Sequence, residues 1–256
     1  MILAVDIGNS DTTLGLFSEE KLIHDWRTTS GFSRTSDEYG VLINSFLSQA
    51  KTASDDISGV VICSVVPSLT DIIAHMSEKY LHKTAIIVSS KLDLGVPILI
   101  DNPEQLGADR ICNAVAGIRD YDLPLVVVDF GTATTFDVIS SKGEYLGGVI
   151  APGVETSAND LFRRAAQLPK IDFRFPDKII GKNSIHSMQS GIMNGAVAVV
   201  DSMISAIEKE IGEKMNTVAT GGFAHLITPK CTTVNDINAH LTLEGLNYIY
   251  NIVSSK

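Results

Sequence analysis

The first apolar run of the chain predicts a buried strand that ends at an acid and then turns back. Positions 2–5 are apolar, Asp6 follows, and the apolar pattern resumes at 14–17 after glycine and small polar residues. Apolar runs on either side of such residues are typical of a β-hairpin. Gly8 lets the backbone approach a ligand, and Asp6 is placed to hold a cation at the mouth of the strand. For this segment alone, an ordinary polar turn is an equal alternative.

A second segment, residues 126–138, repeats this order of apolar strand, acid, glycine, small polar residues and second strand. Three positions align without a gap, pairing an acid, a glycine and a threonine: Asp6 with Asp129, Gly8 with Gly131, and Thr12 with Thr135. A repeat of this length indicates two copies of one unit, each beginning with its own phosphate-binding hairpin.

Apolar spacing predicts alternating strands and helices over the rest of the first half. The expected elements are a strand over 21–27, a helix after a capping box at 35–38, a strand over 60–66, a helix over 69–80, a strand over 85–88, and a helix that begins at Pro103 with Asn102 as N-cap. This order is typical of a mixed α/β domain.

The second half follows the same plan after its hairpin. The expected elements are a glycine-rich strand and turn over 144–153, a helix from about 154, an extended loop over 173–187, a helix over 188–211, a strand over 217–220 that runs into a Gly-Gly turn, and a helix over 241–253. We therefore predict an α/β protein with an N-terminal domain over 1–118 and a C-terminal domain over 119–256.

Composition and charge narrow the function classes. The chain has 256 residues, of which 45% are hydrophobic and 20% charged, and its formal net charge is −10. No basic face is visible, so we expect no nucleic-acid partner. The three cysteines, Cys63, Cys112 and Cys231, have the spacing of neither a metal site nor a disulfide framework. We expect no signal peptide and no membrane span, which favours the cytoplasm.

Several local motifs leave two interpretations open. Gly107, placed early in a predicted helix, indicates close packing, while the adjacent Asp109–Arg110 pair is also typical of a surface ion pair. The Gly221–Gly222 turn suits the approach of a nucleotide, and it equally suits a plain strand–helix connection. His24 beside Trp26 favours a structural role over a catalytic one. Residues 64–68 form either a ligand loop or a simple connection.

Taken together, the motifs resemble one family. Residues 6–10, 101–103, 107–110, 129–134, 147–153 and 219–222 occur in the order, and over nearly the full length, of the type III pantothenate kinases. These belong to the superfamily of actin, sugar kinases and Hsp70. The resemblance implies two ribonuclease-H-like, actin-like ATPase domains with ATP in the cleft between them. It also implies phosphorylation of pantothenate to 4′-phosphopantothenate, the first step toward coenzyme A, by a cytoplasmic homodimer.

The resemblance also implies roles for individual residues. ATP would be bound by Asp6, Ile7, Gly8, Asn9, Ser10, Asp11, Thr12, Thr13, Thr132, Gly221 and Gly222. Pantothenate would be bound by Ile100, Gly107, Ala108, Asp109, Arg110 and Ser184. Asp109 would accept the proton of the primary hydroxyl. Asp6 would lie near Mg²⁺ carried by ATP, and Asp129 would bind the monovalent cation, potassium or ammonium.

The chain departs from the family pattern at a few positions. Ser10 and Ser184 stand where threonine is usual, and both keep the hydroxyl. Ile100 offers only apolar contact. Two alternatives stay open: another phosphotransferase or phosphatase of the superfamily, and a non-catalytic regulatory accessory protein. The presence of Asp6, Asp109 and Asp129 weighs against the regulator, and the glycine-led helix at 107–110 weighs against the other enzymes.

Overall fold

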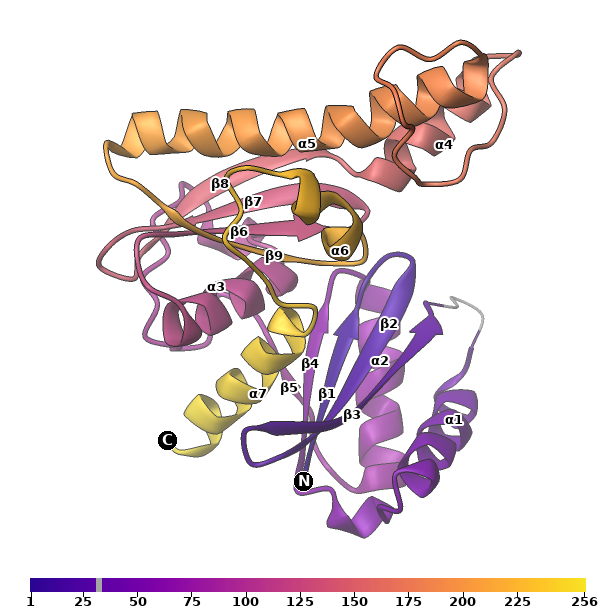
Figure 1. The fold of residues 1–256 in the computed structure, drawn as a ribbon. Coiled ribbons are helices and arrows are strands. Elements are labelled where there is room, and N and C mark those ends of the chain that lie inside the picture. Colours follow the sequence, from indigo (N-terminus) through magenta and orange to yellow (C-terminus); the bar gives the residue numbers. More distant parts are fainter. Residues whose placement is uncertain (31–33) are drawn as a thin grey trace. The chain divides into compact units, whose positions relative to one another are not determined.

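The computed structural model describes residues 1–30 and 34–256, which form two compact units (Figure 1). The first unit holds residues 1–119 together with 240–256, and the second holds residues 120–239. The sequence division at 118/119 therefore misplaces the C-terminal segment. Helix α7 (Leu241–Ser254) packs on strands of the first unit, which local sequence patterns could not reveal.

The first unit is built on a five-stranded mixed sheet of order β3-β2-β1-β4-β5. The strands are β1 (Ile2–Ile7), β2 (Asp11–Ser18), β3 (Lys21–Thr29), β4 (Gly59–Ser64) and β5 (Ile86–Ile87). β1, β2 and β3 pair antiparallel, while β4 runs parallel to both β1 and β5. The helical elements are α1 (Ser36–Gln49), η1 (Ser54–Asp56), α2 (Pro67–Met76), η2 (Ser77–Leu81), η3 (Pro103–Gln105), α3 (Ala108–Asp120) and α7.

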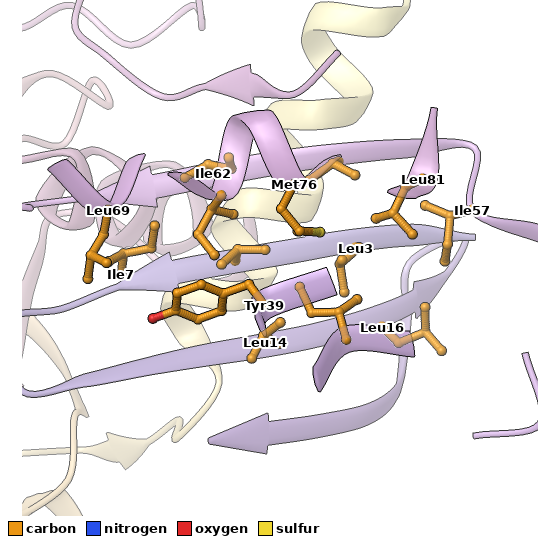
Figure 2. Packing of buried hydrophobic residues seen from close by; sticks show 14 of the residues in the cluster. Leu3, Ile7, Leu14, Leu16, Tyr39, Ile57, Ile62, Leu69, Met76 and Leu81 are labelled. Atoms are coloured by element: carbon orange, nitrogen blue, oxygen red, sulfur yellow. The ribbon is translucent and has the colours of Figure 1, made fainter. Parts of the chain in front are cut away.

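Alternation along the strands fills both faces of this sheet. Leu14 and Leu16 of β2 join a core with Leu3, Tyr39 and the apolar side of α2 (Figure 2). The intervening Gly15 faces the opposite way, toward Leu243 of α7. Burial of such side chains stabilises the unit by about 1.5–3 kcal/mol for each large aliphatic residue. The first hairpin is therefore held on a sheet that is covered on both faces.

The second unit repeats the sheet plan with order β10-β9-β6-β7-β8. Its strands are β6 (Leu125–Phe130), β7 (Ala133–Ile139), β8 (Tyr145–Pro152), β9 (Asn216–Thr220) and β10 (Asp236–Ile237). Its helical elements are α4 (Val154–Arg164), α5 (Ser184–Ile211), α6 (Ala224–Ile227) and η4 (Thr228–Lys230). Two units with matching strand order confirm the predicted two-domain α/β fold.

Most of the elements expected from the sequence are present, the helix expected over 69–80 is α2 followed by the π-turn η2, and two other helices begin several residues from the expected start. The capping box is confirmed, because Thr35 and Glu38 cap α1 reciprocally. The helix expected from Pro103 is wrong in its first part: Pro103–Gln105 form only a 3₁₀ turn, Leu106 is extended, and α3 begins at Ala108. The long helix of the second unit begins at Ser184 rather than 188, because the Asn183 side chain accepts from the N–H of His186.

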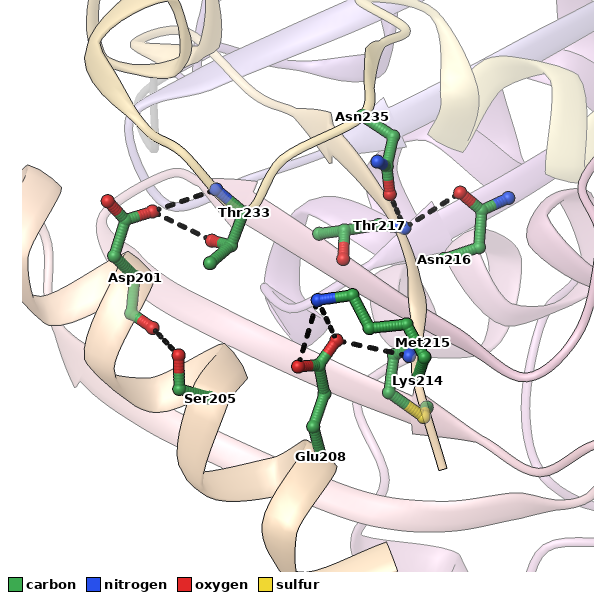
Figure 3. Close-up of polar contacts among 9 residues, drawn as sticks. All are labelled: Asp201, Ser205, Glu208, Lys214, Met215, Asn216, Thr217, Thr233 and Asn235. Atoms are coloured by element: carbon green, nitrogen blue, oxygen red, sulfur yellow. Dashed lines mark hydrogen bonds and ion pairs between the residues drawn. The ribbon is translucent and has the colours of Figure 1, made fainter. Parts of the chain in front are cut away.

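Helix α5 anchors the loops that follow it through two carboxylates (Figure 3). Asp201 accepts from the amides and hydroxyls of Thr232 and Thr233 at 2.8–3.1 Å. Glu208 accepts from the Met215 amide at 3.1 Å and pairs with Lys214. Burial raises the pKa of Asp201, but the hydrogen bonds from Thr233 and Thr232 outweigh it, so the pKa lies below its usual value. These bonds fix the segment that leads into β9 and the segment that leads into β10.

Among the described residues, helix α5 is the element that bears on the expected absence of a membrane span. It has 28 residues, and an 18-residue window has a mean hydropathy of 1.4 with 28% of that window buried. By length and composition alone it could cross a membrane. The core helices of soluble proteins pass the same test, so one such helix is weak support for a membrane span.

Candidate functional site

The first hairpin turns over Gly8, Asn9 and Ser10, between β1 and β2. The Gly8 amide donates to the carbonyl of Asp11 at 3.0 Å, and a Cβ at Gly8 would stand 3.0 Å from that same oxygen. Asn9 and Ser10 are exposed, while the Asp11 carboxylate pairs with Arg27 of β3 at 3.1 Å. The turn thus presents short polar residues and open backbone to solvent, as a phosphate site requires.

The two hairpins align differently from the sequence interpretation. Ile7 stands opposite Thr12 in the first, and Phe130 stands opposite Thr134 in the second. The Gly131 amide donates to the carbonyl of Ala133, two residues ahead, whereas the Gly8 amide donates to the carbonyl of Asp11, three residues ahead. The second turn is one residue shorter, so Thr12 corresponds to Thr134 rather than Thr135, and the gapless match is wrong beyond the glycine.

Two residues predicted to bind ATP have side chains inside the unit. Ile7 is 1% exposed and Thr12 is 2% exposed. The Thr12 hydroxyl lies 3.0 Å from that of Ser30, within the interior. Thr13 and Asp6 are half-buried, on the side of the strands opposite to Thr12 and Ile7. Ile7 and Thr12 therefore support the turn from within.

Asp109 lies in the first turn of α3. Its Oδ1 accepts from the Arg110 amide at 2.8 Å and folds over Gly107, where a Cβ would overlap it. The close neighbour expected at Gly107 is therefore the Asp109 carboxylate itself. Gly107, Asp109 and Arg110 are half-buried, and Ala108 is buried. A side chain at position 107 would require the Asp109 carboxylate to move.

A buried thiol pair connects Asp109 with Asp6. The pKa of Cys63 is raised well above its usual value by its hydrogen bond to Cys112, by burial, and by the nearby charges of Asp6 and Asp109. Burial, with the same two carboxylates, also raises the pKa of Cys112. Cys63 stands opposite Asp6 across the parallel β1–β4 pair, and Cys112 is one turn beyond Asp109. Asp6 and Asp109 therefore share one neighbourhood in the first unit.

The second hairpin is braced by the start of α4. Gly153 and Thr156 both donate to the carbonyl of Thr132, at 3.2 and 2.6 Å. A Cβ at Gly153 would overlap the carbonyl oxygens of Gly131 and Thr132. The Thr132 side chain is exposed. The sequence marked Gly153 only as part of a glycine-rich motif, and its role in supporting the hairpin emerges from the structure.

The Gly-Gly turn of the second unit lies directly against Asp129. Gly221 has φ +89°, and a Cβ there would overlap Asp129 Oδ1 and approach the backbone of Phe130 to 2.7 Å. The Phe223 amide donates to the Phe130 carbonyl at 3.4 Å, and Gly222 is exposed. The structure therefore brings together Asp129, which was predicted to bind the cation, and Gly221, which was predicted to contact ATP.

Ser184 lies elsewhere in the second unit. It is exposed at the start of α5 and lines a pocket of about 710 Å³ with Leu161, Lys182 and Ser187. Thr132 contacts the first residues of α4, whereas Leu161 is near the last, and the helix is about 16 Å long. Ser184 is therefore not brought to the second hairpin. Ile100 is half-buried in the irregular segment before η3.

The described residues contain no ready-made metal cage. Within residues 1–30 and 34–256, no three His, Cys, Asp or Glu side chains are grouped to hold a metal ion. Sequence reasoning also missed Ser30, a buried serine at the end of β3 that contacts the first turn. No sequence signal marks it, because its contacts depend on how β3 pairs with β2.

Comparisons with known proteins show which family this chain resembles. The family model for type III pantothenate kinase matches residues 2–206. A type III pantothenate kinase of Citrifermentans bemidjiense is 44% identical over 250 residues, which cover 98% of each chain.

Two solved structures share the fold at low identity. The activator of the 2-hydroxyisocaproyl-CoA dehydratase from Clostridium difficile has a TM-score of 0.57 at 12% identity, over 99% of this chain and 95% of that one. A ROK hexokinase from Thermus thermophilus has a TM-score of 0.56 at 12% identity, over 100% of this chain and 99% of that one. The fold is that of the actin-like ATPases and sugar kinases, and the matched family model with its close relatives shows that this chain belongs to the type III pantothenate kinase family.

Proposed function

We propose that this chain transfers the γ-phosphoryl group of ATP to the primary hydroxyl of pantothenate, giving ADP and 4′-phosphopantothenate. Family membership supports the reaction, and one observation carries the assignment of residues: Asp6 at the first hairpin and Asp109 on α3 share one neighbourhood. Phosphoryl transfer needs a phosphate cradle beside a group that can take the proton of the acceptor. The first unit supplies both.

The first hairpin would bind the phosphates through the backbone of its turn, with Asn9 and Ser10 offering side-chain donors. Asp6 would take part in holding Mg²⁺, and this fits the finding that its carboxylate, like that of Asp109, lies near the buried thiols of Cys63 and Cys112. Bound Mg²⁺ neutralises phosphate charge in such reactions. Since no three protein ligands are grouped among the described residues, the phosphates of ATP would complete its coordination.

Asp109 would act as the general base. Its Oδ1 is held by the Arg110 amide, which leaves Oδ2 for the substrate hydroxyl. A carboxylate in this role typically contributes about 10²–10⁴-fold to the rate. Gly107, Ala108 and Arg110 would position pantothenate around it, and Ile100 would add an apolar contact.

Asp129 would bind the monovalent cation, potassium or ammonium, with Gly221 packed against its carboxylate. Thr132, Gly221 and Gly222 would contact ATP from the second unit. A carboxylate beside exposed loop backbone offers the oxygen ligands that alkali cations prefer.

We further propose a cytoplasmic homodimer with neither nucleic-acid nor membrane partners. The net charge of −10 does not favour a polyanion partner. Apolar side chains are exposed around the start of α5: Ile179 at 68%, Ile180 at 83% and Ile185 at 43%. Such a patch is typical of a protein interface, and a two-fold axis would pair it with itself. Ser184 lies in this patch, so it would complete the pantothenate pocket of the partner subunit.

A coupled ADP-release assay, run with and without pantothenate, tests the function. We expect ADP release that requires pantothenate, loss of most turnover in Asp109→Asn with nucleotide binding retained, and no change in Glu104→Gln, a matched loss of charge at an exposed neighbour. Release without pantothenate would instead identify a phosphatase, and no release in any condition would favour a regulator. Near-normal turnover in Asp109→Asn would refute the general base.

A further inference from the structure

Ser30 is a buried serine that follows β3 and contacts three residues of the first hairpin. It is 7% exposed. Its Oγ donates to the Gly8 carbonyl at 2.6 Å and lies 3.0 Å from Thr12 Oγ1, and its amide donates to the Ser10 carbonyl at 2.9 Å. One residue therefore bonds to both ends of the exposed turn and to the strand beneath it.

The number of protons gives this network a direction. The Gly8 carbonyl can only accept, so Ser30 uses its one hydroxyl proton in the 2.6 Å bond. In the 3.0 Å contact Ser30 Oγ must then accept, and Thr12 donates. The buried Thr12 hydroxyl therefore donates its proton to Ser30 Oγ. This hydrogen bond satisfies a polar side chain that faces the interior of the unit.

The orientation of the turn amides follows from these bonds. In a trans peptide the C=O and N–H groups point in opposite directions. Because the carbonyls of Gly8 and Ser10 both point toward Ser30, the N–H groups of Asn9 and Asp11 both point away from it. Neighbouring amides aimed to one side form a concavity suited to phosphate oxygens.

We propose that Ser30 is a positioning residue for ATP, which orients the Asn9 and Asp11 amides toward the nucleotide phosphates, with Thr12 orienting Ser30 in turn. The proposal rests on the proposed function, since it needs phosphates at this hairpin. Ser30 is not required for the strand register, because β1 and β2 pair directly from Ile2–Phe17 to Ile7–Thr12. Its bonds act on the turn, which is the part that would touch the ligand.

The test compares Ser30→Ala with Ser77→Ala in the full-length protein. Ser77 is likewise buried and donates its hydroxyl to a backbone carbonyl, that of Lys83, at 2.7 Å. Both variants lose one such bond, and Ser30→Ala also loses the contact with Thr12, so it should lose somewhat more thermal stability than Ser77→Ala; unfolding is followed by the fluorescence of Trp26, the single tryptophan. Only Ser30→Ala should raise the KM for ATP, by about three- to tenfold for one hydrogen bond, with the KM for pantothenate unchanged.

Conservative variants separate positioning from packing. Ser30→Thr keeps the hydroxyl and should recover ATP affinity. Thr12→Val should weaken ATP binding in the same direction but less, and Thr12→Ser should restore it. If Ser30→Ala does not fold, the KM values for ATP of Thr12→Val and Thr12→Ser test the proposal instead, and equal values in these two variants would contradict it. An ATP KM in Ser30→Ala no higher than in Ser77→Ala would overturn the proposal.

Calorimetric titration with ADP keeps this result distinct from the function test. If wild type binds ADP but does not phosphorylate pantothenate, the proposed function fails, and the ADP affinity of Ser30→Ala still decides the role of Ser30. If wild type phosphorylates pantothenate and Ser30→Ala binds both nucleotides as wild type does, only the role of Ser30 is wrong.

Discussion

Replacing Gly221 with alanine should destabilise the second unit, because the added Cβ would clash with the backbone of β6 where the second hairpin begins. Gly221 has φ +89°, and an added Cβ would meet Asp129 Oδ1 and the Phe130 backbone. The left-handed conformation alone costs alanine about 1 kcal/mol. Overlap with backbone, which cannot rotate away, adds about 1–3 kcal/mol. We expect a total loss of about 2–4 kcal/mol in the free energy of unfolding of the second unit.

Gly212 offers a matched control, because it has φ +81° and nothing lies within 4 Å of its added Cβ. Gly212→Ala should lose only the conformational part, about 1 kcal/mol. Urea unfolding followed by far-ultraviolet circular dichroism measures both, since Trp26 reports on the first unit. Gly221→Ala should also displace Asp129 and weaken activation by potassium. Equal destabilisation of the two variants would show that Gly221 does not pack closely on Asp129, and would refute the reasoning.

Three further predictions concern the second unit. Turnover should require potassium or ammonium, and equal rates in sodium-only buffer would argue against the role of Asp129. Because the pKa of Asp201 is lowered in the folded state, its stabilisation is present above the usual value of 3.8 and is lost as pH falls below it. Asp201→Asn should therefore lower the free energy of unfolding, measured by urea denaturation, by about 1–3 kcal/mol at pH 7 and by much less below pH 3.8. The matched variant Asp160→Asn, at an exposed position, should change it little at either pH. Ile180→Asp should give monomers in sedimentation, whereas Val41→Asp, at a similarly exposed position of the first unit, should sediment as wild type does.

Much of the fold could be predicted because its signals are local. Thr35 and Glu38 are three residues apart, and that spacing alone fixed the start of α1. Each hairpin is likewise encoded by an apolar run, a glycine and a second run. The acids and glycines of the candidate site could be proposed for the same reason.

The errors arose where partners are distant in sequence or where a turn changes length. Helix α7 packs Gly245 against the backbone of Cys112, more than a hundred residues away, so no local pattern assigns it to the first unit. The match of Thr12 to Thr135 failed because a one-residue difference in the turn leaves the apolar pattern intact. Ser30 was invisible because its function depends on its placement opposite Ser10.

The return of α7 to the first unit has a consequence for synthesis on the ribosome. The first sheet is complete in sequence by Ile87, yet helix α7, which packs on its strands, is translated only after the whole second unit. At about 5–20 residues per second, the 120 residues of the second unit delay that helix by about 6–24 seconds. Through that interval the apolar side chains that α7 covers lack this partner, and exposed apolar surface of that kind is aggregation-prone.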